Sequence, residues 1–269
     1  MPVDAPAQTP RPTTAYREVA PPAAARAHLV CLWAQEVGGG AGLAQPVLPD
    51  ACVDVLWVND GAPVVAGPST RAFVASVPPG TVAVGARFRP GWSAGALGVD
   101  ASALRDLHVP LSDVAPALAR RLSTVVADRE GVAEKLAAAA ELLARPLADA
   151  PPPDAVVREA VRRLAADPEM RVHDLGRELF LSPRQLQRRL LSAVGHAPKT
   201  LHRVLRLQRL LALAAAAPGA PLSMLALRAG YADQAHMTRD LRDLTGRAPT
   251  ALLASTDSAL RMADLFDLR

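Results

Sequence analysis

The chain has 269 residues, of which 50% are apolar, so it is not a disordered protein and is long enough for two domains with their own cores. Its net charge of +4 is unevenly divided. Residues 1–154 hold 12 Lys/Arg against 15 Asp/Glu, a net of −3, whereas residues 155–255 hold 16 against 8, a net of +8. The cations of this basic half are all arginine except Lys199, and they predict a polyanionic partner.

The cysteines and the terminal sequence exclude further classes of protein. Cys31 and Cys52 are too few for a disulfide framework, and no C-x-x-C pair is present to hold zinc. We therefore expect no metal and no cofactor. Residues 1–19 lack the apolar segment of a signal peptide, and no uninterrupted apolar run is of membrane-spanning length. These features predict a cytoplasmic, nucleoid-associated protein with no membrane partner.

The N-terminal part of the chain has the pattern of a β-rich domain. Residues 1–15 are rich in Pro, Thr and Ala and predict a disordered tail, and a regulatory domain is expected over 16–146. Apolar and polar residues alternate over 53–57, and Asn59-Asp60-Gly61 then predicts a tight turn. The same alternation recurs over 81–88. The first part of this domain is therefore predicted to be mostly β.

Helical spacing replaces the alternation further along the chain. Residues 101–107, 116–126 and 131–144 carry apolar residues at helical intervals. The last of these contains the stripe Val132–Leu143, which either packs on the sheet or forms the seam of a homodimer. The segment 146-PLADAPPPD-154 is too rich in Pro to continue a helix, so a linker is predicted over 147–154.

The strand-like segments carry the charged and aromatic residues that a polar ligand pocket needs. The alternative is that they form ordinary turn caps and ion pairs. Trp33, Trp57 and Trp92 could line such a pocket, but core packing is the preferred interpretation for all three. Cys31 and Cys52 are interpreted as small buried apolar residues, with an alkyl-acceptor or enzymatic domain as the alternative. No nucleophile–base pair at an informative spacing supports an enzyme. The candidate effector-binding residues are Asp50, Asp54, Trp57, Arg71, Arg87 and Arg89.

An internal repeat with an offset of 51 residues occupies the basic half of the chain. The pattern aromatic-x-[Ser/Asp]-x3-apolar-x-Arg-x-Leu-x4-Gly-x-Ala-Pro starts at Phe180 and again at Tyr231. Ser182 and Asp233 are placed to cap a helix, and each helix is followed by a Gly and a Pro that end it. A second short helix precedes each copy. The repeat therefore predicts two helix-turn-helix units.

The outer face of the capped helix in each unit carries Arg and Gln side chains, opposite the apolar residues. Arg reads guanine and Gln reads adenine in the major groove, and Ala235 offers only a methyl contact. One such face is usually a solvated surface, but two in register on the basic half favour DNA recognition. The predicted base contacts are Arg184, Gln185, Gln187, Arg188, Gln234, Ala235, Thr238 and Arg239.

A long helix is predicted over 199–217, between the two units, with its apolar residues buried against both. If it spaces the recognition helices by one duplex turn, roughly 34 Å, both enter successive major-groove segments on one face of the DNA. The expected fold class is thus α+β: a β-rich domain with trailing helices, then an all-α domain over 155–255 and a tail over 256–269. The candidate phosphate contacts, which set affinity and salt dependence, are Ser182, Lys199, Arg203, Arg206, Arg209, Arg242 and Arg247.

Residues 155–255 resemble the DNA-binding domain of the AraC/XylS family of bacterial transcription regulators. The resemblance lies in 230-GYADQAHMTRDLRDLTGRAP-249 and in 182-SPRQLQRRLLSAVGHAP-198. It implies a seven-helix domain with two helix-turn-helix units. By this resemblance the base contacts fall on Arg184, Gln187, Arg188, Gln234, Ala235, Thr238 and Arg239. Met237 and Leu241 replace two Phe residues of the family pattern and remain apolar. The segment 249-PTALLAS-255 departs further, because it lacks the usual aromatic–Arg pair.

Three N-terminal segments resemble a sensor-like domain of unknown function that is found ahead of such DNA-binding domains. They are 47-VLPDACVDVLW-57, 66-AGPSTRAF-73 and 84-VGARFRPGW-92. Together the two resemblances imply a non-enzymatic transcription regulator. Its expected partners are double-stranded promoter or operator DNA, RNA polymerase, a small-molecule effector and a second copy of the chain.

Overall fold

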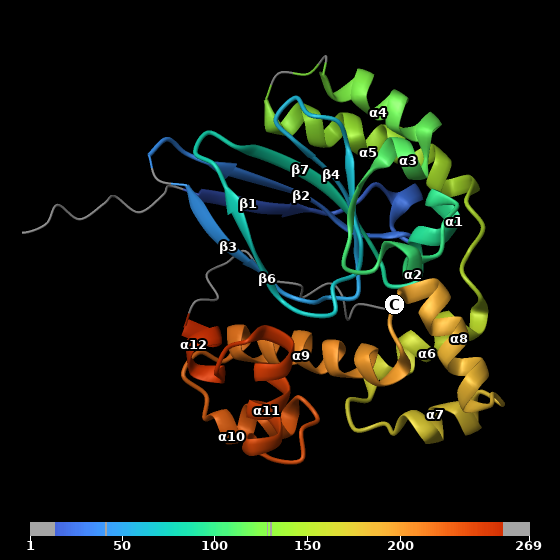
Figure 1. Ribbon diagram of the computed structural model, residues 1–269, viewed down its shortest axis with the longest axis vertical. Coiled ribbons are helices and arrows are strands. Elements are labelled where there is room, and N and C mark those ends of the chain that lie inside the picture. The colour runs from blue at the N-terminus through green and yellow to red at the C-terminus, as the bar shows by residue number, and fades with distance from the viewer. Residues whose placement is uncertain (1–13, 41, 128, 130, 255–269) are drawn as a thin grey trace, which may run out of the picture.

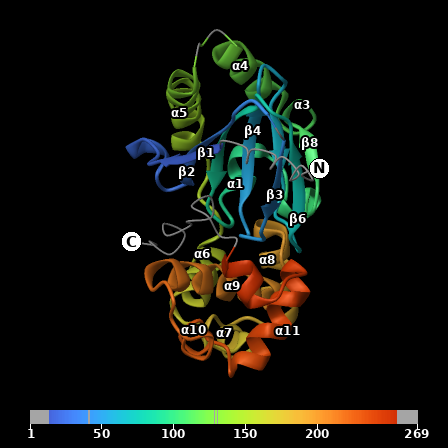
Figure 2. The same cartoon turned by 90° about the vertical axis from the view of Figure 1, so that its left-hand side faces the viewer.

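The computed structural model describes residues 14–40, 42–127, 129 and 131–254. A β-rich part with its own helices lies above an all-helical part, and residues 150–154 connect the two (Figures 1 and 2). This arrangement confirms the α+β class and the order of domains expected from the sequence. The predicted tail over 256–269 and residues 1–13 of the predicted N-terminal tail lie outside the described residues. Residues 14 and 15, also expected in that tail, instead begin the first strand.

The β-rich part contains a six-stranded antiparallel sheet and a separate two-stranded ribbon (Figure 1). The strand order of the sheet is β1-β2-β7-β4-β5-β8, and the ribbon pairs β3 with β6. The strands are β1 (Thr14–Val19), β2 (Leu29–Val37), β3 (Leu43–Val47), β4 (Val53–Val58), β5 (Val64–Ala66), β6 (Phe73–Val77), β7 (Val82–Phe88) and β8 (His108–Pro110).

The alternation predicted along β4 and β7 gives the sheet two different faces. Val53, Val55 and Trp57 of β4 are buried in a core shared with helices, and Val84, Ala86 and Phe88 of β7 belong to the same core. The intervening side chains of both strands point to the opposite face. The sheet is therefore covered by helices on one face, while its other face remains available for a cavity.

The helices of this part cover that first face, with α4 and α5 lying across the sheet (Figure 1). Val132, Leu136 and Leu143 of α5 are at most 7% exposed and pack in the sheet core. The packing interpretation of this stripe is confirmed. The helical elements are η1 (Ala23–Ala25), α1 (Ser93–Leu97), α2 (Ala101–Leu104), α3 (Leu111–Val114), α4 (Pro116–Ala127) and α5 (Val132–Asp149).

The linker is shorter than the Pro-rich segment indicated. α5 continues past position 146 and ends at Asp149, so the expectation that the helix stops before Pro146 is wrong. A proline inside a helix removes a single backbone donor, and burial outweighs this loss here because Leu147, 1% exposed, anchors the final turn in the sheet core. Only residues 150–154 connect the two parts outside regular structure.

The helical part contains two short helix pairs, α7–α8 and α10–α11, with α9 between them (Figure 1). Leu201, Val204 and Leu205 of α9 are at most 2% exposed and belong to a core that includes residues of both pairs. This confirms the long central helix. The helices are α6 (Ala155–Ala166), α7 (Val172–Glu178), α8 (Pro183–Val194), α9 (Pro198–Ala216), α10 (Leu222–Arg228), α11 (Gln234–Thr245) and α12 (Pro249–Ala254).

The two parts pack directly against each other, because one apolar core continues from β2 into the helical part. Within the described ranges, two hydrogen bonds cross the boundary. The side-chain amide of Gln208 on α9 donates to the Pro49 carbonyl at 2.6 Å, and the Ala72 N–H donates to the Leu244 carbonyl on α11 at 2.7 Å. The segments around β3 and β6 therefore contact the central helix and the second recognition helix directly.

Candidate functional site

The first unit has the capped geometry that its sequence predicts. The Ser182 side chain accepts a hydrogen bond from the Gln185 N–H at 3.3 Å, and the Gln185 side chain accepts one from the Ser182 N–H at 2.9 Å. This reciprocal capping box starts α8. Gly195 ends it at a φ of +76°, a conformation that glycine adopts without steric cost.

The second unit is capped by a different residue in the same position. The Asp233 side chain accepts a hydrogen bond from the His236 N–H at 2.6 Å and starts α11, and Gly246 ends the helix at a φ of +69°. The carboxylate also lies favourably at the positive end of the helix dipole. Both recognition helices therefore begin and end as expected.

The turns of the two units differ by one residue. Phe180 has a φ of +55° and is 95% exposed, and Gly230 takes the same role in the second unit at a φ of +88°. The N–H groups of Leu181 and Tyr231 each bond back to the carbonyl five residues earlier. Phe180 thus corresponds to Gly230 and not to Tyr231, so that part of the expected register is wrong. Ala232 is the extra residue.

The outward faces of α8 and α11 carry the predicted base-reading side chains. Leu186 and Leu190 of α8 are buried, as are Met237 and Leu241 of α11, which fixes the orientation of each helix. Thr238 is half-buried and its hydroxyl donates to the Gln234 carbonyl at 2.8 Å. The predicted readers that are exposed are Arg184, Gln185, Gln187, Arg188, Gln234, Ala235 and Arg239.

Gln185 is less available than its exposure implies. Its side-chain oxygen is occupied by the capping box, so only its amide nitrogen is left to face a base. Arg184, Arg188 and Arg239 have no ion pair within the described part of the chain. Of the predicted base contacts, these three guanidiniums and Gln187 are exposed and are not used in capping α8.

The predicted phosphate contacts divide into surface groups and groups used within the domain. Lys199 and Arg242 are exposed, and Ser182 is exposed while capping α8. Arg203 instead pairs with Asp240, and with Asp243 at 3.3 Å, so it joins α9 to α11. Because Asp240 is 7% exposed, this pair serves the packing of α11, and the expected phosphate role of Arg203 is not supported.

Three further arginines also form contacts inside the domain. The Arg206 guanidinium donates to the Pro168 carbonyl at 3.0 Å and lies 5.8 Å from the centre of the Tyr231 ring. Arg209 donates to the Arg228 carbonyl at 3.1 Å, and Arg247 donates to the Ala251 carbonyl at 2.9 Å. The basic charge of this half is therefore partly structural.

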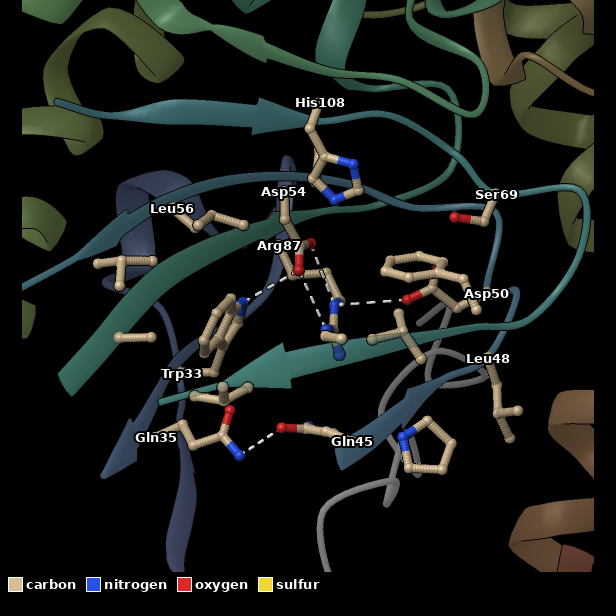
Figure 3. Close-up of a pocket in the computed structure, with 18 of the residues that line it drawn as sticks. Trp33, Gln35, Gln45, Leu48, Asp50, Asp54, Leu56, Ser69, Arg87 and His108 are labelled. Atoms are coloured by element: carbon tan, nitrogen blue, oxygen red, sulfur yellow. Dashed lines mark hydrogen bonds and ion pairs between the residues drawn. The ribbon is translucent and has the colours of Figure 1, made fainter. Parts of the chain in front are cut away.

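A cavity of about 320 Å³ lies between the uncovered face of the sheet and the β3–β6 ribbon (Figure 3). The lining is mainly apolar and aromatic, with Tyr16 and Trp33 stacked at 6.2 Å between ring centres. Gln35 on β2 and Gln45 on β3 hydrogen bond to each other across it. Gln208 of α9 also lines the cavity, which therefore extends to the helical part.

The polar centre of the cavity is Arg87 on β7. It lies directly opposite Asp54 of β4 in the strand register and donates to both oxygens of that carboxylate, at 3.1 and 3.0 Å. The Trp33 indole donates to the same carboxylate at 3.1 Å. Asp50 and Glu18 each lie 3.6 Å from the guanidinium (Figure 3 draws Asp50). Three carboxylates thus surround one cation.

Burial and charge act against each other in this cluster. Burial raises the pKa of the Asp50 carboxyl, Arg87 lowers it, and Asp54 raises it again, with a raised pKa as the result. Burial alone lowers the pKa of Arg87, but Asp54 and Asp50 outweigh it and hold that pKa well above its usual range. Arg87 is therefore a permanent cation, whereas Asp50 binds a proton more readily than an ordinary aspartate does.

Three of the six candidate effector-binding residues meet in this cavity: Asp50, Asp54 and Arg87. The other three lie elsewhere. Trp57 is 2% exposed in the helix-covered core on the opposite face of the sheet, and Arg71 is exposed. Arg89 donates to the Arg26 carbonyl at 3.0 Å and does not line the cavity.

Trp33 is 8% exposed and packs in the core, as preferred from the sequence, and its ring also lines the cavity, for which the sequence carries a signal. The signal was its alternation with Cys31 and Gln35 along one face of β2. Gly85 makes room for the indole, because a Cβ at that position would lie 2.5 Å from the ring. Gln208 gave no signal, since its contact with Pro49 spans 159 positions.

Cys31 and Cys52 are buried and unpaired. Burial raises the pKa of both thiols, which disfavours the reactive thiolate. Among the described residues, no group of His, Cys, Asp or Glu is arranged to hold a metal ion. In the same part of the chain, no helix is long and apolar enough to cross a membrane.

Two families match the chain. Residues 175–255 match a family described as a helix-turn-helix domain, which covers both recognition helices. Residues 17–110 match a family described as a domain of unknown function, and this stretch contains most of the cavity-lining residues. Comparison with curated proteins finds no significant match.

Several solved structures of ToxT from Vibrio cholerae are similar in fold. A 1.65 Å structure has 12% identity and a TM-score of 0.45, over 90% of this chain and 98% of ToxT. An apo form has 13% identity and 0.45, over 82% and 99%. ToxT bound to (E)-4-(8-methylnaphthalen-1-yl)but-3-enoic acid has 12% identity and 0.44, over 83% and 97%. Values this low do not allow function to be transferred.

Proposed function

We propose that this protein, a transcription regulator of the AraC type by its helix-turn-helix domain, reads specific DNA sequences with α8 and α11 and responds to a small molecule bound in its N-terminal cavity. One observation carries the DNA-binding part. The two recognition helices present unpaired guanidiniums, Arg184 and Arg188 on one and Arg239 on the other, on opposite ends of a rigid connecting helix.

The connecting helix gives these two faces a fixed relation. α9 is buried against both units, and the pairing of Arg203 with Asp240 holds α11 to it. Fixed spacing lets a protein select two half-sites rather than one, and half-sites one duplex turn apart lie on the same face of the DNA. The base contacts then decide the sequence, while Lys199 and Arg242 contribute the salt-dependent attraction to phosphates.

The effector part of the proposal is supported by the position of the cavity. It lies in the N-terminal part, yet Gln208 of α9 forms one of its walls. A molecule in the cavity therefore contacts the helix that sets the spacing of the recognition helices. A ligand changes DNA affinity only if it interacts differently with two arrangements of the protein, and this wall is where such a difference arises.

The proposal is tested by selecting duplexes from a random library with the full chain. The expected result is a bipartite site with half-site centres about 10 base pairs apart. Binding to the selected duplex should weaken steeply with salt, since several phosphate contacts release counterions. If no sequence is enriched although binding remains sensitive to salt, the protein binds DNA without sequence specificity and the proposed sequence recognition is wrong.

An enzymatic or alkyl-accepting N-terminal domain is the alternative, and no observation favours it. Nucleophilic cysteines need a lowered pKa, whereas burial raises the pKa of both Cys31 and Cys52. Intact-mass spectrometry of the folded protein after exposure to methyl iodide checks this. We expect no adduct on either thiol under conditions that alkylate an exposed model cysteine.

A further inference from the structure

We propose that the ligand of the cavity is a small apolar amine or a similar nitrogen cation, held by Asp50 and the aromatic wall, and not a carboxylate. This inference deepens the proposed function, on which it rests, by naming the class of the effector. It follows from how the polar groups of the cavity are already used, from the charge that remains, and from the residue that carries this charge.

Arg87 is the cation that an anionic ligand would need, and it is already occupied. Its Nε and Nη2 atoms donate to the two carboxylate oxygens of Asp54, at 3.1 and 3.0 Å. This is the bidentate geometry that guanidinium groups prefer. Glu18 and Asp50 occupy its remaining surroundings at 3.6 Å each. A carboxylate ligand would have to approach Arg87 among these three carboxylates, and the lining described for the cavity includes no other Lys or Arg.

The remaining charge of the cavity is negative. Among the residues that line the cavity, ionised Asp50 and Asp54 bring two negative charges against the single positive charge of Arg87, a formal sum of −1. Glu18, outside this lining, adds a further negative charge 3.6 Å from the guanidinium. Burying like charges together is unfavourable, so the cluster stabilises an added cation and repels an added anion. The complementary ligand therefore brings a positive charge.

Asp50 is the carboxylate that can still form a hydrogen-bonded ion pair with a cationic ligand. One of its oxygens accepts a hydrogen bond from the Cys52 N–H at 2.9 Å. The other is 3.6 Å from the Arg87 Nε atom, which is too far for a hydrogen bond. Its raised pKa shows that the ionised form lacks full compensation, which an ammonium group would supply. Asp54, by contrast, is held by Arg87 and Trp33 together.

The walls fit the apolar body of such a ligand. Tyr16 and Trp33 stack at an interplanar angle of 27°, and Leu48, Leu56 and Phe73 line the rest of the cavity (Figure 3). Aromatic faces attract cations, and more strongly when water is excluded. A volume of about 320 Å³ suits a molecule with one ring and a short chain.

The segment that contains Asp50 is hydrogen bonded to the helical part of the protein. The next residue back, Pro49, accepts the hydrogen bond from Gln208 of α9 at 2.6 Å. Movement of the 48–52 segment toward a ligand therefore changes the position of the carbonyl that holds α9. The lining of the cavity also includes Phe73, and the N–H of its neighbour Ala72 donates to the Leu244 carbonyl of α11.

Calorimetry of the full chain with three matched probes tests the ligand class: 2-phenylethylamine, 2-phenylethanol and phenylacetate. At neutral pH these are a cation, a neutral molecule and an anion of similar shape. We expect the amine to bind at least about tenfold more tightly than phenylacetate, with the alcohol between them. Asp50→Asn should reduce the preference for the amine to less than about threefold. Asp60→Asn, the same change at an exposed turn of the same domain, should leave it intact.

Binding of the selected duplex, with and without saturating 2-phenylethylamine, tests the coupling. We expect a change in DNA affinity of at least about threefold, lost in Gln208→Ala. Tighter binding of phenylacetate, or a preference unaffected by Asp50→Asn, overturns the ligand class while leaving the regulator intact. Absence of binding by all three probes also overturns it. Amine binding that leaves DNA affinity unchanged refutes the coupling, and with it the effector part of the proposed function.

Discussion

Arg87 in the cavity and Arg239 on α11 are the same residue in opposite surroundings. Arg87 is surrounded by three carboxylates, one of them in bidentate contact, so its charge is already matched by carboxylates of the protein. Arg239 is exposed, with no ion pair within the described residues. A buried arginine needs carboxylates or other acceptors around it, because burial removes the water that solvates its charge. A surface arginine stays hydrated and can remain free for a partner.

The two halves of the chain differ in net charge and in how they use their arginines. The helical half carries the larger positive charge and leaves part of it at the surface for DNA. The N-terminal half is net negative and concentrates carboxylates around one buried cation. The same side chain therefore predicts a DNA contact in one place and a structural ion pair in the other, and only its neighbours distinguish the two.

Removing the buried cation should have the largest effect. Arg87→Leu leaves the carboxylates of Asp50, Asp54 and Glu18, whose side chains are only 13–20% exposed, without a counterion, so we expect the free energy of unfolding to fall by about 3 kcal/mol. Urea denaturation followed by circular dichroism measures it. Arg71→Leu, an exposed arginine of the same domain, should change it by less than about 0.5 kcal/mol. Equal effects of the two variants would mean that the cluster is not a buried ion-pair network.

The boundary between the halves holds a histidine that should make stability depend on pH. His196 is 1% exposed, neither ring nitrogen has a hydrogen-bond partner among the residues that the structure describes, and burial lowers its pKa to about 4. Its unfolded pKa is about 6.5, so the unfolded chain gains a proton first as the pH falls. The stability contributed by neutral His196 is therefore fully present above about pH 6.5 and is lost progressively toward pH 4.

His196→Leu tests this contribution. Between pH 7 and pH 4.5, the variant should lose about 2–3 kcal/mol less unfolding free energy than the natural chain. Comparing the two chains isolates this histidine from the carboxylates that titrate in the same range. His173→Gln, at an exposed position, should follow the natural chain. A variant as sensitive to acid as the natural chain contradicts the assignment.

Removing the surface cation should affect DNA binding and not folding. Arg239→Ala is expected to weaken binding to the selected duplex by about 1–3 kcal/mol and to relax the preference at one base pair, with an unchanged unfolding free energy. Fluorescence anisotropy at fixed salt measures it. Arg120→Ala, which removes the same charge from the exposed surface of α4, should have no such effect. Equal affinities of Arg239→Ala and the natural chain would remove Arg239 from the base-reading face.

The smallest effect is expected at the turn of the first unit. Phe180 has a φ of +55°, which costs an ordinary residue about 1–2 kcal/mol, whereas Gly230 takes the corresponding place without this cost. Glycine has more conformational freedom in the unfolded chain, and losing it on folding costs about 0.5–1 kcal/mol. The net effect of Phe180→Gly should therefore be a stabilisation of about 0.5 kcal/mol. Phe180→Ala removes the ring but keeps the strain, and should give no gain in thermal melting. Equal melting temperatures for the two variants would show that the turn is not strained.

Much of the helical half was predictable because its signals are local. Ser182, Asp233, Gly195 and Gly246 cap their helices through bonds within one turn, and the exposed and buried faces follow from helical spacing alone. The register of the repeat failed at Phe180 for a local reason as well: the second unit has one more residue between its turn and its cap. The alternation over 53–57 and 81–88 fixed the faces of the sheet in the same way.

The cavity was not predictable in this way, because it is assembled from contacts between distant segments. Asp54 and Arg87 were both candidates, but only strand pairing places them opposite each other, and it leaves Trp57 on the far side of the same strand. Arg203 shows the converse. It has the sequence environment of a phosphate contact, yet the fold brings Asp240 within reach and uses its charge inside the domain.

The sequence by itself determined the two capped helix-turn-helix units, their outward Arg and Gln faces and the strand alternation, because these depend on neighbours within a few residues. The tertiary structure alone decided which arginines are free, which three carboxylates surround Arg87, and that α9 forms a wall of the cavity through Gln208. The physical reason is that a buried charge takes its partners from whatever segments the fold brings together, and this pairing leaves no periodic trace in the chain.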